Sequence, residues 1–364
     1  MSVFKSFLLG GFECAVLAKP DGELLDYIDD TGHAAHARAD YRRLAETGIL
    51  GARDGLRWYL IDRGSYYDWS SAIGQVRVAS EMGVEVIWDL CHYDCPPDVD
   101  IWSEAFVQRF AAYAAAAARF VADYSSPPFR FCPVNEMSYW AWAGGAAGLF
   151  YPCAHERAHE LKRQLARAFI AGARAIRDVL PEAIIVSAEP LIHVRSTNEA
   201  SGEGYNNAQF DAVERVLGVG TEELDGSPDL IDLIGINYYP HNQWYASGNT
   251  IPLGHWDYQP LSALLETVKK RYGRPVLLTE TGAHGSGKAA WLHYVLTEAG
   301  KARSAGVWVE GVCLYSIVSF RHWFDPGMND VGLWGPVDAF GHRQVDEIFH
   351  DFLSRVIGEA VSLT

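Results

Sequence analysis

Two glutamates, Glu136 and Glu280, each end a short apolar run and are well placed for acid–base chemistry. The first run reads Phe-Cys-Pro-Val-Asn135-Glu136 and the second reads Val-Leu-Leu-Thr-Glu280. In glycoside hydrolysis, one carboxylic acid protonates the leaving oxygen, and a second carboxylate attacks the sugar or activates water. One glutamate in such a place would be interpreted as a solvated loop residue. Two of them, the first preceded by an asparagine, favour a catalytic pair.

These runs belong to a repeated pattern of short apolar segments and longer helical stretches. The apolar segments are typical of strands buried on both faces, and they span residues 6–15, 56–62, 84–90, 129–135, 183–188, 230–238, 274–280 and 309–318. Helical stretches such as 103–124 and 155–180 lie between them. Four of the helical stretches end on a glycine just before a strand, at positions 48, 83, 273 and 306. The pattern predicts βα units with a parallel sheet.

Eight strands alternating with helices favour a closed α/β barrel, the (β/α)₈ or TIM barrel, over an open sheet. No glycine-rich phosphate loop follows the first strand, which argues against a nucleotide-binding fold. We find no linker, repeat or low-complexity block, so we expect residues 1–364 to form one barrel domain. Active sites of such barrels form at the carboxyl ends of the strands. Glu136 and Glu280, which end strands 4 and 7, should therefore share one mouth.

The composition of the chain limits the classes of binding partner that we expect for the protein. A net charge of −16 without a basic run argues against nucleic acid and anionic membranes as partners. No segment approaches the ~18 apolar residues of a membrane helix, and the N-terminus resembles a strand more than a signal peptide. Cys91 and Cys95 lack the second pair that a zinc finger needs. We therefore expect a cytoplasmic protein with no cofactor or metal, and association into a homo-oligomer stays open.

The motifs, taken in order, resemble those of glycoside hydrolase family 1 and of the wider clan of (β/α)₈ retaining β-glycosidases. The family's Asn-Glu after strand 4 is matched by Asn135-Glu136, and its Thr-Glu-Asn-Gly after strand 7 by Thr279-Glu280-Thr281-Gly282. Four further stretches are similar to motifs at strands 2, 3, 6 and 8: Arg57-Trp58, His92-Tyr93-Asp94-Cys95-Pro96, Gly235-Ile236-Asn237-Tyr238-Tyr239, and Tyr315-Ser316 through His322-Trp323. The resemblance implies that Glu136 is the acid/base and Glu280 the nucleophile.

The resemblance also implies roles for residues that support the nucleophile. Arg57 would hold Glu280 ionised, because an opposite charge stabilises a carboxylate. A salt bridge in the barrel wall is the alternative for this arginine. Tyr239 would donate its hydroxyl to Glu280, and Tyr238 is the better candidate for a core residue.

A second group would bind the sugar. Asn135 would hydrogen-bond the sugar 2-hydroxyl, with Asn237 as a weaker candidate for the same region. His92 would bind another hydroxyl or serve as a structural histidine. Tyr315, His322 and Trp323 would line the site, with Trp323 as a stacking floor.

Two positions depart from the family pattern. Ala18 aligns with a sugar-binding glutamine, and His322 aligns with a glutamate that clamps two hydroxyls. The catalytic residues are thus retained while the sugar-binding residues differ. Glu189, at the end of strand 5, is left as a binding residue.

The sequence predicts a retaining glycosidase that forms a covalent glycosyl-enzyme and acts on an unidentified sugar. A transglycosidase and a carbohydrate-binding protein that has lost its activity are alternatives. A metal-dependent hydrolase using His92, Asp94, His193 and His241 is a further alternative, disfavoured because strand 1 carries no His-x-His pair.

Overall fold

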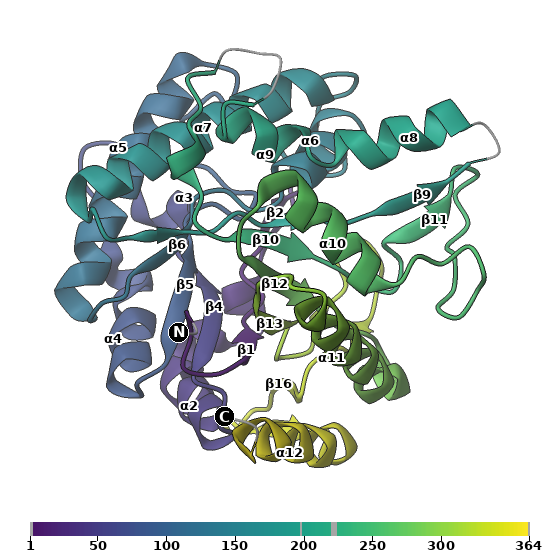
Figure 1. Cartoon of the computed structure of the whole chain (residues 1–364). Coiled ribbons are helices and arrows are strands. Elements are labelled where there is room, and N and C mark those ends of the chain that lie inside the picture. The colour runs from purple at the N-terminus through teal and green to yellow at the C-terminus, as the bar shows by residue number, and fades with distance from the viewer. Residues whose placement is uncertain (1–2, 197–198, 220–223, 363–364) are drawn as a thin grey trace.

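A parallel sheet lies at the centre of the computed structural model, which describes residues 3–196, 199–219 and 224–362 (Figure 1). Its strands are β1 (Leu8–Gly11), β4 (Gly51–Gly55), β5 (Glu85–Asp89), β6 (Arg130–Cys132), β7 (Ile184–Ile185), β8 (Glu189–Pro190), β10 (Ile234–Asn237), β12 (Val276–Thr281) and β13 (Val309–Tyr315). They are hydrogen-bonded in the order β7-β6-β5-β4-β1-β13-β12-β10-β8.

The first and last members of this order are two halves of one strand. Residues 186–188 join β7 to β8, and within them Val186 pairs in parallel with Leu233, next to β10. The Ser187 amide donates to the Leu233 carbonyl at 3.1 Å. The order therefore begins and ends on the same segment of chain, which closes eight strands into a barrel. The predicted (β/α)₈ fold is confirmed.

The helices lie around the barrel, and most of them cover its outside (Figure 1). They are α1 (Tyr27–Asp30), α2 (His33–Glu46), α3 (Trp58–Ile61), α4 (Ile73–Glu81), α5 (Glu104–Tyr124), α6 (Met137–Gly145), α7 (Ala158–Val179), α8 (Glu199–Ala208), α9 (Asp211–Val216), α10 (Leu261–Tyr272), α11 (Lys288–Ser304) and α12 (Glu347–Ser362). The start of α5 shows why the chain turns helical there, because the Ser103 hydroxyl accepts from the Phe106 amide. The four predicted glycine ends all have positive φ.

Apolar side chains form two layers. A small cluster fills the barrel itself and includes Leu9, Ile87, Leu277 and Cys313. A much larger cluster lies between the strands and the surrounding helices. The interior of the barrel is thus only partly apolar, and its remaining volume holds the charged groups described below.

The second strand differs from the prediction. Residues 56–62 were expected as a strand, but β4 is Gly51–Gly55, and α3 begins at Trp58. The sequence Gly-Ala-Arg-Asp-Gly has little strand propensity. It forms a strand because Arg53 finds partners inside the barrel, while Asp54 accepts from Tyr41 in the helical layer at 2.7 Å.

Short strand pairs extend the loops that follow the barrel strands. They are β2 (Val16–Ala18) with β3 (Leu24–Asp26), β9 (His193–Arg195) with β11 (Gln243–Tyr245), β14 (Phe320–Arg321) with β15 (Met328–Asn329), and β16 (Trp334–Val337) with β17 (Arg343–Val345). The pair β9–β11 projects from the barrel beside α8 (Figure 1).

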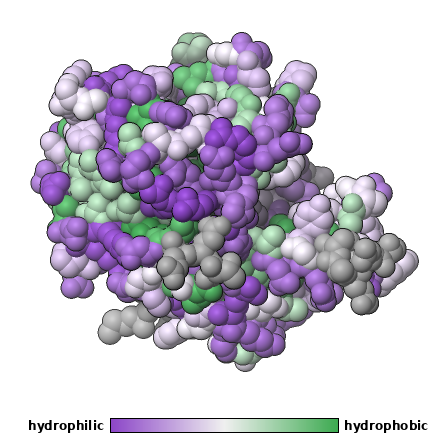
Figure 2. Space-filling view, turned by 90° about the horizontal axis from the view of Figure 1, so that it is seen from above, coloured by the Kyte–Doolittle hydropathy of each residue, from purple (hydrophilic) through white to green (hydrophobic). Residues whose placement is uncertain are grey.

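The surface in Figure 2 is mainly hydrophilic, with small separate apolar patches. No helix in the described part of the chain has the length and apolar character needed to cross a membrane.

Candidate active site

Arg53 on β4 is the centre of a buried polar network. Its side chain is fully buried, and its Nη1 donates to Glu280 Oε1 at 2.5 Å. Its Nε lies 3.0 Å from Asp89 Oδ1, and its Nη2 lies 2.8 Å from Asp89 Oδ2. Nη2 also donates to Asn135 Oδ1 at 2.6 Å. One guanidinium therefore holds residues of β5 and β12 and of the segment after β6, which is possible because its planar fork offers five donors.

Arg57 does not take this position. Its guanidinium donates to Asp26 Oδ2 at 3.0 Å and to the Ser71 carbonyl at 3.1 Å, outside the network around Glu280. The expectation that Arg57 lies beside Glu280 is therefore wrong, and its alternative as a salt bridge is correct. The cause is the shifted strand, since Arg57 precedes α3 rather than lying inside the barrel.

Glu280 on β12 is held from two sides. Arg53 contacts Oε1, and the Tyr239 hydroxyl donates to Oε2 at 2.9 Å, as the sequence predicts. The residue is 5% exposed, so its carboxylate is largely screened from water. Tyr238 points the other way and is hydrogen-bonded to Tyr258 in the core, as expected.

Glu136 lies just before α6 with an unusual backbone. Its φ of 42° and ψ of 57° place a non-glycine residue in the left-handed region. The Tyr93 hydroxyl donates to Oε2 at 2.5 Å, and Asn237 Nδ2 donates to Oε1 at 2.9 Å. Burial among packed groups and the negative charge of Glu280 raise the pKa of Glu136 to about 8, although both hydrogen bonds act to lower it. Burial and the neighbouring charge thus favour the protonated form of Glu136.

Glu189 binds the first turn of α6, so the Glu136 side chain is not needed there and can face the site. Glu136 precedes the first turn of α6 but makes no capping hydrogen bond to it. Glu189 from β8 accepts the Ser138 amide at 3.1 Å instead. Burial raises the pKa of Glu189 to about 7, and its second oxygen has no hydrogen-bond partner. This residue supports α6, and its assignment to sugar binding stays a prediction.

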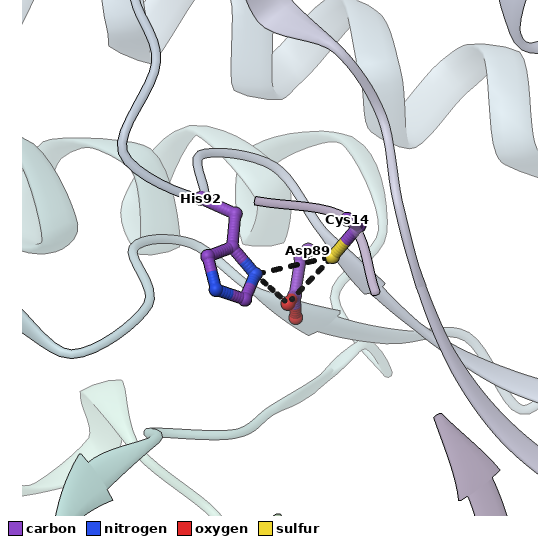
Figure 3. Close-up of side chains that lie close together, drawn as sticks. All are labelled: Cys14, Asp89 and His92. Carbon is purple, nitrogen blue, oxygen red and sulfur yellow. Dashed lines mark hydrogen bonds and ion pairs between the residues drawn. The ribbon is translucent and has the colours of Figure 1, made fainter. Parts of the chain in front are cut away.

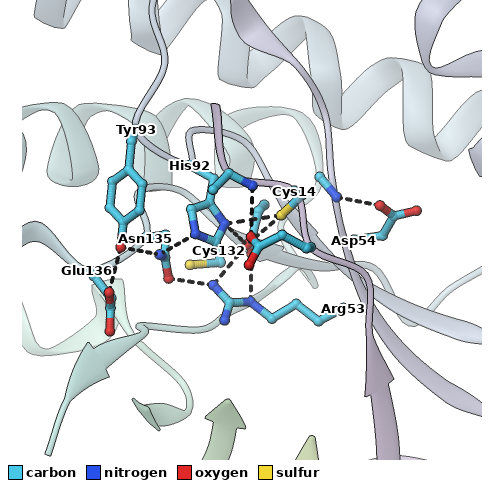
Figure 4. Close-up of polar contacts among 12 residues, drawn as sticks. Cys14, Arg53, Asp54, His92, Tyr93, Cys132, Asn135 and Glu136 are labelled. Atoms are coloured by element: carbon cyan, nitrogen blue, oxygen red, sulfur yellow. Dashed lines mark hydrogen bonds and ion pairs between the residues drawn. The ribbon is translucent and has the colours of Figure 1, made fainter. Parts of the chain in front are cut away.

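Asn135 and His92 are engaged by the protein itself. Asn135 Nδ2 lies 2.8 Å from His92 Nε2 and donates to the Tyr93 hydroxyl at 3.1 Å. His92 Nδ1 contacts Asp89 Oδ2 at 3.1 Å. Both ring nitrogens of His92 thus have protein partners and the residue is 4% exposed, which favours the structural alternative over sugar binding. Figure 4 shows the resulting chain from Arg53 through Asn135 and Tyr93 to Glu136.

Cys14, Asp89 and His92 lie close together (Figure 3). The Cys14 sulfur lies 3.1 Å from His92 Nδ1 and 3.5 Å from Asp89 Oδ2, and the trio is the one group in the described residues with metal-ligand spacing. Arg53 already supplies a positive charge to Asp89. Although burial alone would raise the pKa of Asp89, Arg53 and His92 hold it below its usual range. Cys14 and Asp89 therefore hold the His92 ring in place by hydrogen bonds.

The other residues of the proposed metal hydrolase are not part of this trio. Asp94 accepts the Tyr59 amide at 2.9 Å, and burial raises its pKa to about 7. His193 lies on β9, and His241 stacks on Tyr239 with ring centroids 5.6 Å apart.

Aromatic rings surround Glu136. Trp323 is partly buried, and its ring lies 5.9 Å from that of Tyr93 and 6.2 Å from that of Tyr139. This position is compatible with the expected stacking surface. His322 is also partly buried and stacks on His284 at 5.9 Å.

Tyr315, at the end of β13, links the network around Arg53 to the segment that follows β1. Its ring covers the Arg53 guanidinium at 5.4 Å, and its hydroxyl lies 3.3 Å from Glu13 Oε1. Ala18, aligned with a sugar-binding glutamine, lies in β2, where its carbonyl accepts the Tyr151 amide at 2.8 Å. Glu13, in the segment that follows β1, is instead the residue that contacts the network through Tyr315.

Four residues of the network were given no role in the sequence analysis: Arg53, Asp89, Tyr93 and Glu13. A signal existed for Arg53, because a helix that ends at Gly48 requires the next strand to begin soon after it. A signal also existed for Glu13, which follows an apolar strand just as Glu136 and Glu280 do. Tyr93 has a φ of 73°, and nothing in its sequence context indicates that conformation.

Neither a protein-family model nor a curated protein matches the chain in sequence. Among solved structures, a family 1 β-glucosidase from Thermotoga maritima is similar over 98% of this chain and 98% of its own, with a TM-score of 0.80 and 16% identity. The β-glucosidase of that organism in complex with deoxynojirimycin has a TM-score of 0.78, and in complex with cyclophellitol 0.79, each at 16% identity and the same coverage. The chain therefore has the fold of the family 1 β-glucosidases.

Proposed function

We propose that the protein is a retaining glycoside hydrolase of the β-glycosidase type, with Glu280 as nucleophile and Glu136 as acid/base. The observation that carries the proposal is the unequal environment of two carboxylates at one barrel mouth. Glu280 is held by a buried cation and a tyrosine hydroxyl, which stabilise and aim a negative charge. Glu136 is desolvated, and its pKa of about 8 suits a proton donor.

The reaction proceeds in two steps. A Glu280 oxygen bonds to the anomeric carbon while the bond to the leaving oxygen breaks, and Glu136 transfers its proton to that oxygen. Glu136, now ionised, then removes a proton from water. The resulting hydroxide attacks the anomeric carbon, releases Glu280 and leaves the sugar with its original anomeric configuration.

Covalent trapping tests this assignment directly. A 2-deoxy-2-fluoro glycoside with a good leaving group should add one sugar mass to a peptide that contains Glu280. Glu280→Gln should prevent the labelling and lower the turnover of aryl β-glycosides by on the order of 10⁴-fold or more. Proton NMR of the first product should show retention. Inverted product, or label on another residue, would remove Glu280 from the nucleophile role.

The variant Glu136→Gln tests the acid/base role separately from the nucleophile role of Glu280. This variant should lose most activity on glycosides with poor leaving groups, which need a proton, and keep more on 2,4-dinitrophenyl glycosides, which do not. Equal loss on both would contradict the acid/base assignment.

A further inference from the structure

Glu189 is a buried carboxylate that binds the start of the helix next to the acid/base. It lies on β8, is 4% exposed, and its Oε2 accepts the Ser138 amide at 3.1 Å. Ser138 is the second residue of α6, and the first amides of a helix have no partner inside the helix. The acceptor for such an amide commonly comes from the residue just before the helix, which here is Glu136. In this protein a residue from another strand supplies it.

A second hydrogen bond joins the same two segments of chain. The Glu136 amide donates to the carbonyl of Ala188, the residue before Glu189, at 2.8 Å. The φ of 42° at Glu136 is unfavourable for a residue other than glycine, and such a conformation persists only where the surrounding contacts hold it. Residues 188 and 189 therefore bind the backbone on both sides of the Glu136 side chain, at the amides of residues 136 and 138.

The strand that carries Glu189 is tied to a donor of the Glu136 carboxyl group. In the barrel, Glu189 pairs with Ile236 of β10, and Pro190 pairs with Asn237. The side-chain amide of Asn237 donates to Glu136 Oε1 at 2.9 Å. The pair of strands β8 and β10 thus fixes both the backbone and one carboxyl oxygen of Glu136.

The other oxygen of Glu189 makes no hydrogen bond. Oε1 is fully buried without a partner, and the residue lines a cavity together with Phe210 of α9 and Tyr272 of α10. Lys162, whose charge lowers the pKa of Glu189, forms an ion pair with Asp211 at 3.8 Å. Burial has the larger effect and raises the pKa of Glu189 to about 7. A carboxyl group that is buried with so few partners is costly, and such groups are found preferentially at functional sites.

We propose that Glu189 is a positioning residue for the acid/base Glu136, which it holds in the reactive conformation through the first turn of α6. This inference rests on the proposed function. Without the bond from Glu189, the first turn of α6 loses an acceptor and the left-handed backbone at Glu136 can relax. The carboxyl group of Glu136 would then move away from the leaving oxygen, and a displacement of about 1 Å can slow a reaction by on the order of 100-fold.

Two substitutions separate the position of the acceptor from its charge. Glu189→Asp keeps the charge but shortens the side chain by one methylene group, which withdraws the carboxylate from the Ser138 amide. Glu189→Gln removes the charge but keeps an oxygen that can accept from Ser138. The proposal predicts that Glu189→Asp is impaired and that Glu189→Gln is close to the wild type.

The impairment should be confined to the step in which Glu136 donates its proton. Alkyl β-glycosides need that proton, and Glu189→Asp should lower their kcat/KM by about 10- to 100-fold. 2,4-Dinitrophenyl β-glycosides of the same sugar do not need it, and their kcat/KM should stay within about threefold of the wild-type value. Glu189→Gln should stay within about threefold on both substrates, because the acceptor is restored.

A double-mutant cycle shows whether Glu189 acts through Glu136. When Glu136→Gln is already present, Glu189→Asp should cause no further loss of kcat/KM on 4-nitrophenyl β-glycosides, because the proton donor that it positions is gone.

Glu298 on α11 provides a matched control. It is also 4% exposed, and its Oε2 accepts the amide of Ser262, the second residue of α10, at 3.1 Å. Glu298→Asp should disturb the start of a helix in the same way. It should leave the ratio of kcat/KM between the alkyl and dinitrophenyl substrates at the wild-type value.

Four results would overturn the inference. Equal losses of Glu189→Asp on both substrates would favour the sugar-binding role of Glu189 instead. Wild-type rates in folded Glu189→Asp would show that the bond to α6 is not needed. A further loss in the double variant would show that Glu189 acts independently of Glu136. A large loss in Glu189→Gln that is confined to alkyl glycosides would assign the effect to the charge, and this variant keeps the test decisive if Glu189→Asp does not fold.

The proposed function is tested separately. Labelling of Glu280 by the fluoro sugar, together with a loss in Glu136→Gln that depends on the leaving group, would show that only the inference about Glu189 fails. If the wild-type protein is not labelled and the loss in Glu136→Gln is the same for every leaving group, the proposed function fails and the inference fails with it.

Discussion

Removing the Tyr93 hydroxyl should move the proton affinity of Glu136 in a defined direction. This hydroxyl donates to Glu136 Oε2 at 2.5 Å, and a donor stabilises the ionised carboxylate more than the protonated form. Tyr93→Phe should therefore raise the pKa of Glu136 above its present value of about 8. A hydrogen bond to a charged group is worth ~1.5–3 kcal/mol, and the protonated acid retains part of it. At 1.36 kcal/mol per pKa unit, we expect a rise of about one unit.

The pH dependence of kcat/KM measures this shift. Activity on an alkyl glycoside needs protonated Glu136, so it should fall on the alkaline side near pH 8 in the wild-type protein and near pH 9 in Tyr93→Phe. Tyr139→Phe is a matched control, because Tyr139 lies near the charge of Glu136 but makes no hydrogen bond to it. A folded Tyr93→Phe protein whose alkaline limb stays in place, or moves to lower pH, would refute the reasoning.

Three further predictions concern the framework around the site. Arg53→Lys should lower the free energy of unfolding by about 3–5 kcal/mol in a urea titration, because one ammonium group cannot bond Asp89, Asn135 and Glu280 at once and leaves buried groups unpaired, whereas Arg57→Lys should cost clearly less. Gly11→Ala should destabilise by about 1–3 kcal/mol by the same assay, because its new Cβ would lie 2.2 Å from a ring atom of Tyr315. The free energy of unfolding should fall by up to about 3 kcal/mol between pH 6.5 and 9 through His33. Burial opposes the charge of His33, but two aspartates raise its pKa in the folded state to about 9. The protonated form is therefore favoured in the folded state, and this stabilisation is lost as the pH rises. A flat stability profile in that window, or an unchanged slope in His33→Gln, would contradict the last prediction.

The sequence predicts the parts of the site that follow strongly apolar strands. Glu136 and Glu280 lie at the carboxyl ends of such apolar runs, and their place in the barrel follows from strand order. Tyr239 was also predicted, because it belongs to a stretch at the sixth strand that resembles a motif of glycoside hydrolase family 1. These assignments depend on local patterns and on the general geometry of the barrel.

The second strand shows where local patterns are insufficient. The apolar segment 56–62 has the stronger strand pattern, yet the strand forms at Gly51–Gly55, where Arg53 meets charged partners from distant parts of the chain. His92 and Asn135 illustrate the same limit. Their positions were correct, but whether each was free or occupied depended on contacts among three strands. Electrostatic contacts between residues far apart in the sequence decide these cases, and the hydrophobic periodicity of the sequence carries no information about such contacts.

The influence of the Glu280 charge on Glu136 has a consequence for the order of events in the reaction. The negative charge of Glu280 is one of the causes that raise the pKa of Glu136. In the covalent intermediate that we propose, Glu280 becomes a neutral ester, and this repulsion disappears. The affinity of Glu136 for a proton then falls, just when the second step requires it as a base. The same carboxyl group would therefore alternate between donor and acceptor because its neighbour is charged in one half of the cycle and neutral in the other.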